Sequence, residues 1–171
     1  LKAADPESWE KLHVNNIKRV IRALEVYRTT GRTISEHNRI DAQRPDKYKA
    51  ARIVLLYADR QKLYERIDRR VDEMMSAGLE GEVRRLLEEG RGGSTAMQAI
   101  GYKEIASAFR GEISMEQAVE DIKRESRRYA KRQLTWLRRY EDALRINVDE
   151  TENFEEIVRV STDYLRNRKV I

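Results

Sequence analysis

The sequence has no cysteine and only two histidines among its 171 residues. Disulfide bridges, cysteine-ligated zinc and thiol nucleophiles are therefore excluded. His13 and His37 stand in separate polar contexts, where a surface or capping role is commoner than a catalytic one. No apolar stretch approaches the roughly 18 residues of a membrane helix, and the N-terminal residues lack the apolar segment of a secretory signal. We therefore expect a cytoplasmic location and no membrane partner.

The motifs of several enzyme classes are also missing. The chain has no Gly-x-x-x-x-Gly-Lys-Ser/Thr phosphate loop and no His-x-x-x-His pair. The glycine-rich segment 90–93 follows no strand and lacks the Lys-Ser/Thr ending, so it is a weak candidate for a phosphate cradle. No cluster of carboxylates has the spacing of metal ligands. We therefore predict no catalytic residue and no metal ligand in this chain.

Charged side chains are abundant instead. They make up 38% of the residues and leave a net charge of +5, and the mean hydropathy is −0.80 with a pI of about 9.4. Such a composition is typical of a helix-prone chain with a large polar surface. The positive balance favours a polyanionic partner.

The strongest local signal is a basic run from 123 to 139, with eight basic residues and one acid, Glu125. An ordinary solvated helix mixes charges of both signs. Gln133, Thr135 and Trp136 lie within the run, and cations, amides and aromatic rings are the components of a nucleic-acid contact surface. The alternative is a solvated basic face with Trp136 packed in the core, and composition alone leaves both open.

Hydrophobic periodicity predicts an α/β chain that is mostly helical. Residues 52–58 form a short apolar run, typical of a strand covered on both faces, and residues 143–148 predict a second strand. Two strands do not form a stable sheet alone, and the chain begins with Leu1 rather than methionine. We therefore expect part of a larger protein that supplies further strands.

Helices are predicted at most of the remaining positions. They are expected to begin at Asp5, Thr33, Ser114 and Thr151 and to cover 16–30, 60–77 (capped by Asp59), 79–90 and 96–111, the last with a break at Gly101. The helices from Ser114 and Thr151 are expected to end near 140 and 167, and 38–49 is predicted to be a linker. Segment 90–95 is expected to be the loosest. The inward stripe of the long helix is predicted to comprise Ala118, Val119, Ile122, Ser126, Tyr129, Ala130, Gln133 and Leu137.

Three smaller clusters are also candidates for anion binding. Arg66 and Arg70, with Arg60 and Arg69 nearby, share a helix face after the first strand, and guanidinium groups suit diphosphates. The alternative is a solvated face on which these arginines pair with acids of the same helix, Glu65, Asp68, Asp72 and Glu73. The other two clusters are Lys18, Arg19 and Arg22 on one helix, and segment 98–103, where glycine, an aromatic ring and a cation meet at a helix break.

Four ordered segments resemble those of one enzyme family. His13-Val14-Asn15-Asn16-x-x-Arg19-Val20-Ile21-Arg22-Ala23-Leu24-Glu25-Val26 resembles the H-P-N-D-x-x-R-(V/L)-x-R-A-L-E-V segment of the bacterial tRNA dimethylallyltransferases, the MiaA family. Leu79-Glu80-Gly81-Glu82-Val83, segment 98–104 and segment 131–138 follow in the family's order. Val14 stands where the family usually has proline, and Asn16 where it has aspartate. Asn16 is still expected to cap a helix.

The resemblance implies a function and a fold. Members of this family transfer a dimethylallyl group from dimethylallyl diphosphate to N6 of adenine 37 in tRNA, with Mg²⁺, and their core is similar to P-loop kinases with a helical insertion that grips the anticodon arm. The tRNA contacts implied here are Lys18, Arg19, Val20, Ile21 and Arg22; Gln98, Ala99, Ile100, Gly101, Tyr102 and Lys103; and Lys131, Arg132, Gln133, Leu134, Thr135, Trp136, Leu137 and Arg138. Arg66 and Arg70 fall where lid arginines reach the diphosphate.

The family's P-loop, general-base aspartate and first strands match nothing in this chain. The resemblance therefore implies an incomplete P-loop kinase-like core over 50–171, a linker over 41–49, and the end of the tRNA-binding insertion over 1–40. The Mg²⁺ ligands are expected outside the chain, and the full protein is expected to be a monomer. The alternatives are a non-catalytic RNA-binding module and a fragment of a small kinase-like phosphotransferase.

Overall fold

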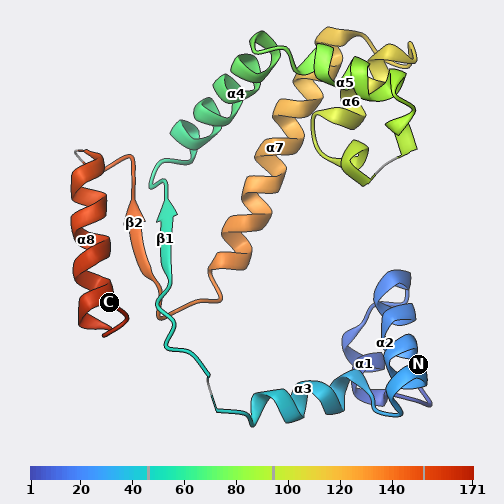
Figure 1. Ribbon diagram of the computed structural model, residues 1–171, viewed down its shortest axis with the longest axis vertical. Coiled ribbons are helices and arrows are strands. Elements are labelled where there is room, and N and C mark those ends of the chain that lie inside the picture. The colour runs from blue at the N-terminus through green and yellow to red at the C-terminus, as the bar shows by residue number, and fades with distance from the viewer. Residues whose placement is uncertain (46, 94, 152) are drawn as a thin grey trace. The chain divides into compact units, whose positions relative to one another are not determined.

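The computed structural model describes residues 1–45, 47–93, 95–151 and 153–171 (Figure 1). These residues divide into two compact units, 1–49 and 50–171. The first is helical, and the second combines helices with a small parallel sheet. The predicted fold class, α/β and mostly helical, is confirmed.

The first unit consists of three helices, two of which are joined by one buried carboxylate. They are α1 (Pro6–Lys11), α2 (Ile17–Thr30) and α3 (Ile34–Ala42). Asp5, only 2% exposed, accepts hydrogen bonds from the backbone N–H of Ser8 in α1 (3.0 Å) and of Ser35 in α3 (3.2 Å). Burial raises the pKa of Asp5, but the hydrogen bonds from Ser8 and Ser35 outweigh it, so the pKa is lowered. The same aspartate thus satisfies free N–H groups at the start of two helices.

The structure differs from the sequence predictions for the 38–49 linker and for the Asn16 cap. Residues 38–42, predicted to be linker, belong to α3, which Thr33 and Glu36 begin with a reciprocal capping box. Asn16 holds the N-cap position of α2, but its side chain makes no capping hydrogen bond. The linker prediction at Asp46 lies outside the described residues.

The sheet of the second unit is a parallel pair, β1 (Ile53–Leu56) and β2 (Leu144–Asn147), with Ile53 aligned to Leu144. Figure 1 shows α8 (Phe154–Asn167) running beside β2, which it contacts. Val54 is buried, but Leu55 on the opposite face is 55% exposed. The described residues therefore cover only one face of β1. Cover on the second face would come from the larger protein that we expect, so a strand covered on both faces stays a prediction.

The apolar core of this unit lies among its other helices. These are α4 (Arg60–Ser76), α5 (Leu79–Glu88), the 3₁₀ turns η1 (Arg91–Gly93) and η2 (Thr95–Gln98), α6 (Tyr102–Phe109) and α7 (Met115–Leu137). Its buried members are Val71, Leu79, Val83, Met97, Ile105, Ala106 and Ile122. Ile105 and Val83 are fully buried, so truncating Ile105 would cost about 2–5 kcal/mol of stability. This core fixes α7 relative to α4 and α6.

Several boundaries in this unit differ from the sequence predictions. Within segment 90–95, η1 covers Arg91–Gly93 and η2 begins at Thr95, while Ser94 lies outside the described residues; the looseness of this segment stays a prediction. Ser114 caps α7 by accepting from the N–H of Gln117 at 3.1 Å, while the Gln117 side chain turns to Asp121 instead of closing the box. Thr151 does not cap α8. Asn153 does, and the Thr151 hydroxyl donates to the carbonyl of Asn147.

The predicted inward stripe of α7 holds only along its first half. Ala118 and Ile122 are buried, and Val119 packs against the core. Tyr129, however, is 49% exposed and Gln133 is exposed. The ion pairs from α4 reach no further along α7 than Arg127, so the prediction for Tyr129 and Gln133 is wrong.

Candidate nucleic-acid interface

The basic run of α7 divides into a paired half and an unpaired half. Lys123 binds Asp72 of α4 at 2.7 Å, and Arg127 binds Asp68 of the same helix. Arg124 pairs with Asp121 at 2.6 Å, and Arg128 pairs with Glu125 at 2.7 Å. The hydrogen bond to Asp72 is the main reason that the pKa of Lys123 is raised. These four cations are neutralised within the chain, and the pairs of Lys123 and Arg127 join α7 to α4.

The second half of the run has no such partners. Lys131, Arg132, Arg138 and Arg139 make no ion pair with any carboxylate in the described part of the chain. Positive charge without a partner is available to an external anion, so this half of α7 is the electrostatic part of the candidate interface.

Aromatic rings lie among these unpaired cations. Trp136 is 53% exposed, so it is not packed in the core of this chain. Its ring meets that of Tyr140 edge to face, with centroids 5.0 Å apart, and the Arg139 guanidinium lies 5.6 Å from its centroid. Arg132 lies 5.5 Å from the ring centre of Tyr129. Rings held by neighbouring cations and still open to solvent are suited to stack on unpaired bases.

Not every predicted contact residue of this segment faces solvent equally. Gln133 and Thr135 are exposed, whereas Leu134 and Leu137 are half-buried. The Thr135 hydroxyl donates to the carbonyl of Lys131 at 3.0 Å, so toward solvent it offers only lone pairs. We therefore regard Leu134 and Leu137 as packing residues of the predicted segment.

Segment 98–103 forms the turn that begins α6. Gly101 has φ of 103° and ψ of −48°, a conformation that residues other than glycine rarely adopt. A Cβ atom there would meet only Leu79, at an ordinary contact distance of 3.6 Å. The conformation, rather than close approach of another backbone, is therefore what requires glycine. Buried Glu104 accepts the N–H of Gly101 at 2.8 Å and fixes the turn.

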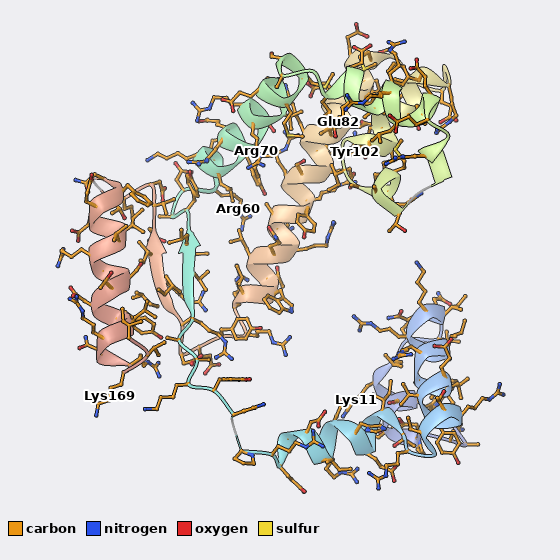
Figure 2. The ribbon with its side chains drawn as sticks, viewed as in Figure 1. Lys11, Arg60, Arg70, Glu82, Tyr102 and Lys169 are labelled. Carbon is orange, nitrogen blue, oxygen red and sulfur yellow. The ribbon has the colours of Figure 1, made fainter. Side chains whose placement is uncertain are left out.

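The side chains of this turn divide between the core and solvent. Gln98, Ala99 and Lys103 are exposed, and Ile100 packs against the core. Tyr102 is half-buried, and its hydroxyl donates to Glu82 of α5 at 2.6 Å (Figure 2). The turn therefore presents an amide, a cation and a held phenol from one rigid piece of backbone.

The arginines of α4 line a separate cavity of about 540 Å³. Arg66, Arg69 and Arg70 lie in its wall with Glu73, Met74 and Ala77. Arg66 donates to the hydroxyl of Tyr57 at 2.8 Å. None of the three pairs with a carboxylate among the described residues, because Asp68 and Asp72 are bound by α7. The ion pairs that the alternative requires along this helix are thus absent among the described residues, but the three arginines are exposed, so a solvated face stays open as the alternative.

The start of α4 is held by two aspartates. Asp59 caps the helix through the N–H of Gln61 at 2.7 Å. Asp149, after β2, accepts the N–H groups of Asp59 (3.0 Å) and Ala58 (2.8 Å). The hydrogen bond from Asp59, with that from Ala58, lowers the pKa of Asp149. The turn that leads to Arg60, Arg66 and Arg70 is thus anchored to the end of the neighbouring strand; Figure 2 labels Arg60 and Arg70 along this helix.

The first unit carries its own basic group on α2. Lys18, Arg19 and Arg22 are exposed, Ile21 is 50% exposed and Val20 is half-buried. Arg22 lies 3.6 Å from Glu25, while Lys18 and Arg19 have no carboxylate partner within the described residues. Arg19 and Arg22 line a cavity of about 490 Å³ that also includes Lys11 and Arg39. Both of those cations bind Glu7, at 2.7 and 3.1 Å.

Three functional candidates, Tyr129, Tyr140 and Glu82, were missed from the sequence, and Arg139 was recognised only as part of the basic run. Tyr129 precedes Trp136 by seven residues, and Arg139 and Tyr140 follow it by three and four. Helical periodicity places residues at these spacings on the same face as Trp136. Tyr129 was instead assigned to the core. Glu82 had no signal in the sequence, because its partner Tyr102 lies 20 residues away.

Two general searches of the described residues give negative results. No three histidine, aspartate or glutamate side chains there come together as metal ligands. Within the same residues, no helix is both long and apolar enough to cross a membrane.

Comparison with known proteins gives consistent matches. A family model described as "IPP transferase" matches residues 1–140. The tRNA dimethylallyltransferase of Acetivibrio thermocellus is 48% identical over 166 residues, covering 96% of this chain and 53% of that protein. The tRNA dimethylallyltransferase of Thermoanaerobacter sp. (strain X514) is 47% identical over 170 residues, covering 98% and 54%. The chain spans about half the length of these curated relatives.

Two solved structures share the fold. The tRNA delta(2)-isopentenylpyrophosphate transferase of Staphylococcus epidermidis superposes with a TM-score of 0.68 at 38% identity, over 98% of this chain and 53% of that one. The tRNA isopentenylpyrophosphate transferase of Bacillus halodurans gives 0.65 at 36% identity, over 98% and 52%.

Proposed function

Because the chain belongs to the IPP transferase family, we propose that it forms the RNA-gripping half of a tRNA dimethylallyltransferase. The complete enzyme transfers a dimethylallyl group from dimethylallyl diphosphate to N6 of adenine 37 in the anticodon stem-loop of tRNA. In this proposal, residues 1–40 end a helical insertion and 50–171 contribute to a P-loop kinase-like core. The protein acts in the cytoplasm as a monomer.

The observation that carries the proposal is the division of charge along α7. Lys123 and Arg127 form ion pairs with Asp72 and Asp68. Lys131 and Arg132 have no ion pair among the described residues, and they lie near exposed Trp136 on the same helix. A helix that served only its own solubility would not concentrate unpaired cations and open rings at one end. Phosphate contacts from the cations and stacking on the ring are the two parts of single-stranded RNA recognition.

The α4 arginines support a second part of the proposal, the diphosphate site. Arg66 and Arg70 are unpaired in the described residues and line one cavity. Guanidinium groups without a carboxylate partner can neutralise the departing diphosphate, and this lowers the barrier to breaking the bond between the diphosphate oxygen and the prenyl carbon. Asp149 and Asp59 hold the turn from which α4 projects these side chains.

In the proposal, Mg²⁺, the phosphate loop and the general base belong to the part of the enzyme that this chain does not match. The flipped adenine and the attacking amine are likewise handled there. This chain contributes the grip on the RNA and the arginines at the diphosphate.

The test is a prenyl-transfer assay with unmodified tRNA, dimethylallyl diphosphate and Mg²⁺. The complete gene product should form product, and the 171-residue chain alone should form none above a blank without protein. Product from the short chain would place the catalytic groups within it. A complete gene product that binds the anticodon arm without transferring the prenyl group would instead support the non-catalytic RNA-binding module.

A further inference from the structure

Glu82 and Tyr102 join two segments of the chain through a short hydrogen bond. The Tyr102 hydroxyl donates to Oε1 of Glu82 at 2.6 Å. Tyr102 is the first residue of α6, and Glu82 lies in the first turn of α5. A bond of this length between a phenol and a carboxylate is charge-assisted and stronger than a bond between neutral groups.

Glu82 serves this bond alone in the described part of the chain. Its neighbour Glu80 is bound by Arg84 at 2.8 Å, but no cation lies within ion-pair distance of Glu82 among the described residues. The Glu82 carboxylate is therefore an uncompensated negative charge next to a turn that also carries Lys103. On a chain with a net charge of +5, this carboxylate places negative charge beside the turn.

The bond to Glu82 determines which hydrogen-bonding groups the Tyr102 hydroxyl offers to solvent. A tyrosine hydroxyl has one proton and two lone pairs. Because Tyr102 gives its proton to Glu82, it presents only an acceptor to solvent. The hydrogen bond, with burial and the charge of Glu82, raises the pKa of Tyr102, so the proton stays in place at neutral pH. An acceptor beside a carboxylate repels phosphates and attracts hydrogen-bond donors.

The backbone beneath Tyr102 is also fixed. Gly101 adopts a left-handed conformation, and buried Glu104 accepts its N–H at 2.8 Å. Tyr102 therefore has its backbone set by one carboxylate and its hydroxyl set by another. Such double restraint is more than α5 and α6 need for packing, since Leu79, Val83 and Ile105 already join them in the core.

We propose that Glu82 is a positioning residue that holds the Tyr102 hydroxyl as an acceptor for a hydrogen-bond donor on an unpaired nucleotide of the RNA. The donor is an exocyclic amine or a ribose 2′-hydroxyl, two of the donor groups that an open loop exposes beside the ring N–H groups of guanine and uracil. The pair gives selectivity among nucleotides, while Lys131 and its neighbours supply phosphate contacts. This inference rests on the proposed function, because it assumes that segment 98–103 meets tRNA.

The experiment measures binding of the complete gene product to anticodon-arm hairpins that each lack one donor in the loop. One set carries a single 2′-deoxy nucleotide, and the other carries a base without its exocyclic amine. Wild-type protein should lose about tenfold in affinity with one member of one set, the effect of a missing hydrogen bond. Which set contains that member identifies the donor. Tyr102→Phe should bind the intact hairpin about tenfold more weakly and be indifferent to that same change.

Variants of Glu82 separate positioning from mere packing. Glu82→Ala should weaken binding about as much as Tyr102→Phe, and the double variant should be no weaker than either, because both act through one bond. Glu82→Gln should restore affinity, since its carboxamide oxygen accepts the phenol proton. Glu80→Gln, on the same helix and with the same change of charge, is the matched control and should bind as wild type does.

Two outcomes would overturn the inference while leaving the proposed function intact. One is a wild-type protein that binds the hairpin, loses affinity with Lys131→Ala, and is unaffected by Tyr102→Phe. The other is Glu82→Ala with a lower melting temperature but unchanged affinity measured well below it, which indicates a packing role only. If wild-type protein binds no anticodon-arm hairpin, the proposed function and this inference both fail.

Discussion

Lys123 of α7 and Asp72 of α4 are joined by an ion pair of 2.7 Å in which the lysine side chain is only 16% exposed. Two turns further along the same helix, Lys131 is exposed and has no carboxylate partner among the described residues. The two lysines lie on one helix, each followed by an arginine, but only Lys123 has carboxylate partners among the described residues. They provide a matched pair for separating stability from RNA binding.

The first prediction contrasts these two lysines in the complete gene product. Lys123→Ala should lower the free energy of unfolding by about 1 kcal/mol, as for a partly buried ion pair, and leave the salt dependence of RNA binding unchanged. Lys131→Ala should change stability by less than about 0.5 kcal/mol. Its slope of log affinity against log salt should fall by about 1.

The measurements are denaturant unfolding and anticodon-arm affinity across a salt series for both variants. If Lys131→Ala and wild type have the same salt slope, this end of α7 does not contact the RNA phosphates. A slope that falls for Lys123→Ala as well would indicate that the ion pair with Asp72 opens on binding.

The second prediction concerns Trp136. With 53% of its surface exposed, its truncation cannot cost the 3–5 kcal/mol of a buried ring. Trp136→Ala should therefore cost about 1 kcal/mol of stability, mostly from its contact with Tyr140. It should weaken anticodon-arm binding by about 1–3 kcal/mol, the effect of losing one base–aromatic stack.

Trp136→Phe provides the control, because it keeps an aromatic face and should recover most of the affinity. The measurements are a thermal melt and a binding titration. If Trp136→Ala loses much stability but keeps its affinity, Trp136 is a core residue of the complete protein. Such a result would mean that residues beyond this chain cover the ring.

The sequence was informative where structure depends on neighbouring residues. Asp5, Asp59 and Ser114 begin helices as predicted, because a capping side chain acts within three residues of itself. The strands at 53–56 and 144–147 were likewise evident from short apolar runs. The family resemblance is confirmed as well, because it rested on ordered motifs spread along the chain.

The sequence was misleading where distant residues decide. Lys123 has a local acid, Glu120, at 3.7 Å, but its closer partner, Asp72 at 2.7 Å, lies on another helix and has no signal in the neighbouring sequence. Tyr129 fits a helical stripe that packing covers only halfway along α7. Thr151 is as good a cap as Asn153 in isolation, but its hydroxyl is engaged by Asn147. Hydrophobic periodicity predicts which face of a helix is apolar, but it does not predict how much of that face a neighbouring helix covers.

The third prediction is a loss of stability in acid that depends on Asp149. Hydrogen bonds from the backbone N–H of Asp59 and Ala58 lower its pKa below the ordinary value of 3.8. A carboxyl with a lowered folded pKa stabilises the fold fully above its unfolded pKa, and that contribution declines as pH falls below about 4. Asp149→Asn should therefore flatten the acid limb of a stability–pH curve between pH 5 and about 2. A curve parallel to that of wild type would show that other carboxyls, such as Asp5, dominate.

The fourth prediction tests the α4 cavity with inorganic diphosphate as the probe. In the complete gene product, Arg70→Ala should raise the inhibition constant of diphosphate against dimethylallyl diphosphate by about tenfold or more, as expected for loss of a charge-assisted hydrogen bond. Arg85→Ala, an exposed arginine on α5 outside the cavity wall, is the control. Equal constants for the two variants would assign the diphosphate to other residues.

The fifth prediction follows from the uncovered face of β1. Leu55 is 55% exposed, and both strands of the pair have an open edge in the described residues. Unpaired edges and exposed apolar side chains promote association. The 171-residue chain alone should therefore be marginally stable and self-associate at micromolar concentrations. Leu55→Lys should reduce association without loss of helicity, since this side chain fills no cavity.

Ile17→Lys is the control for that change, because Ile17 is an exposed apolar residue, at 63%, that belongs to the other unit and not to the sheet. Sedimentation velocity and circular dichroism of the three proteins decide the matter. If Leu55→Lys and Ile17→Lys reduce association equally, the contact is a general effect of added charge and not pairing at the sheet. A monomeric wild-type chain with a sharp cooperative melt would contradict the prediction altogether, because two strands with open edges would then suffice for a stable sheet beside these helices.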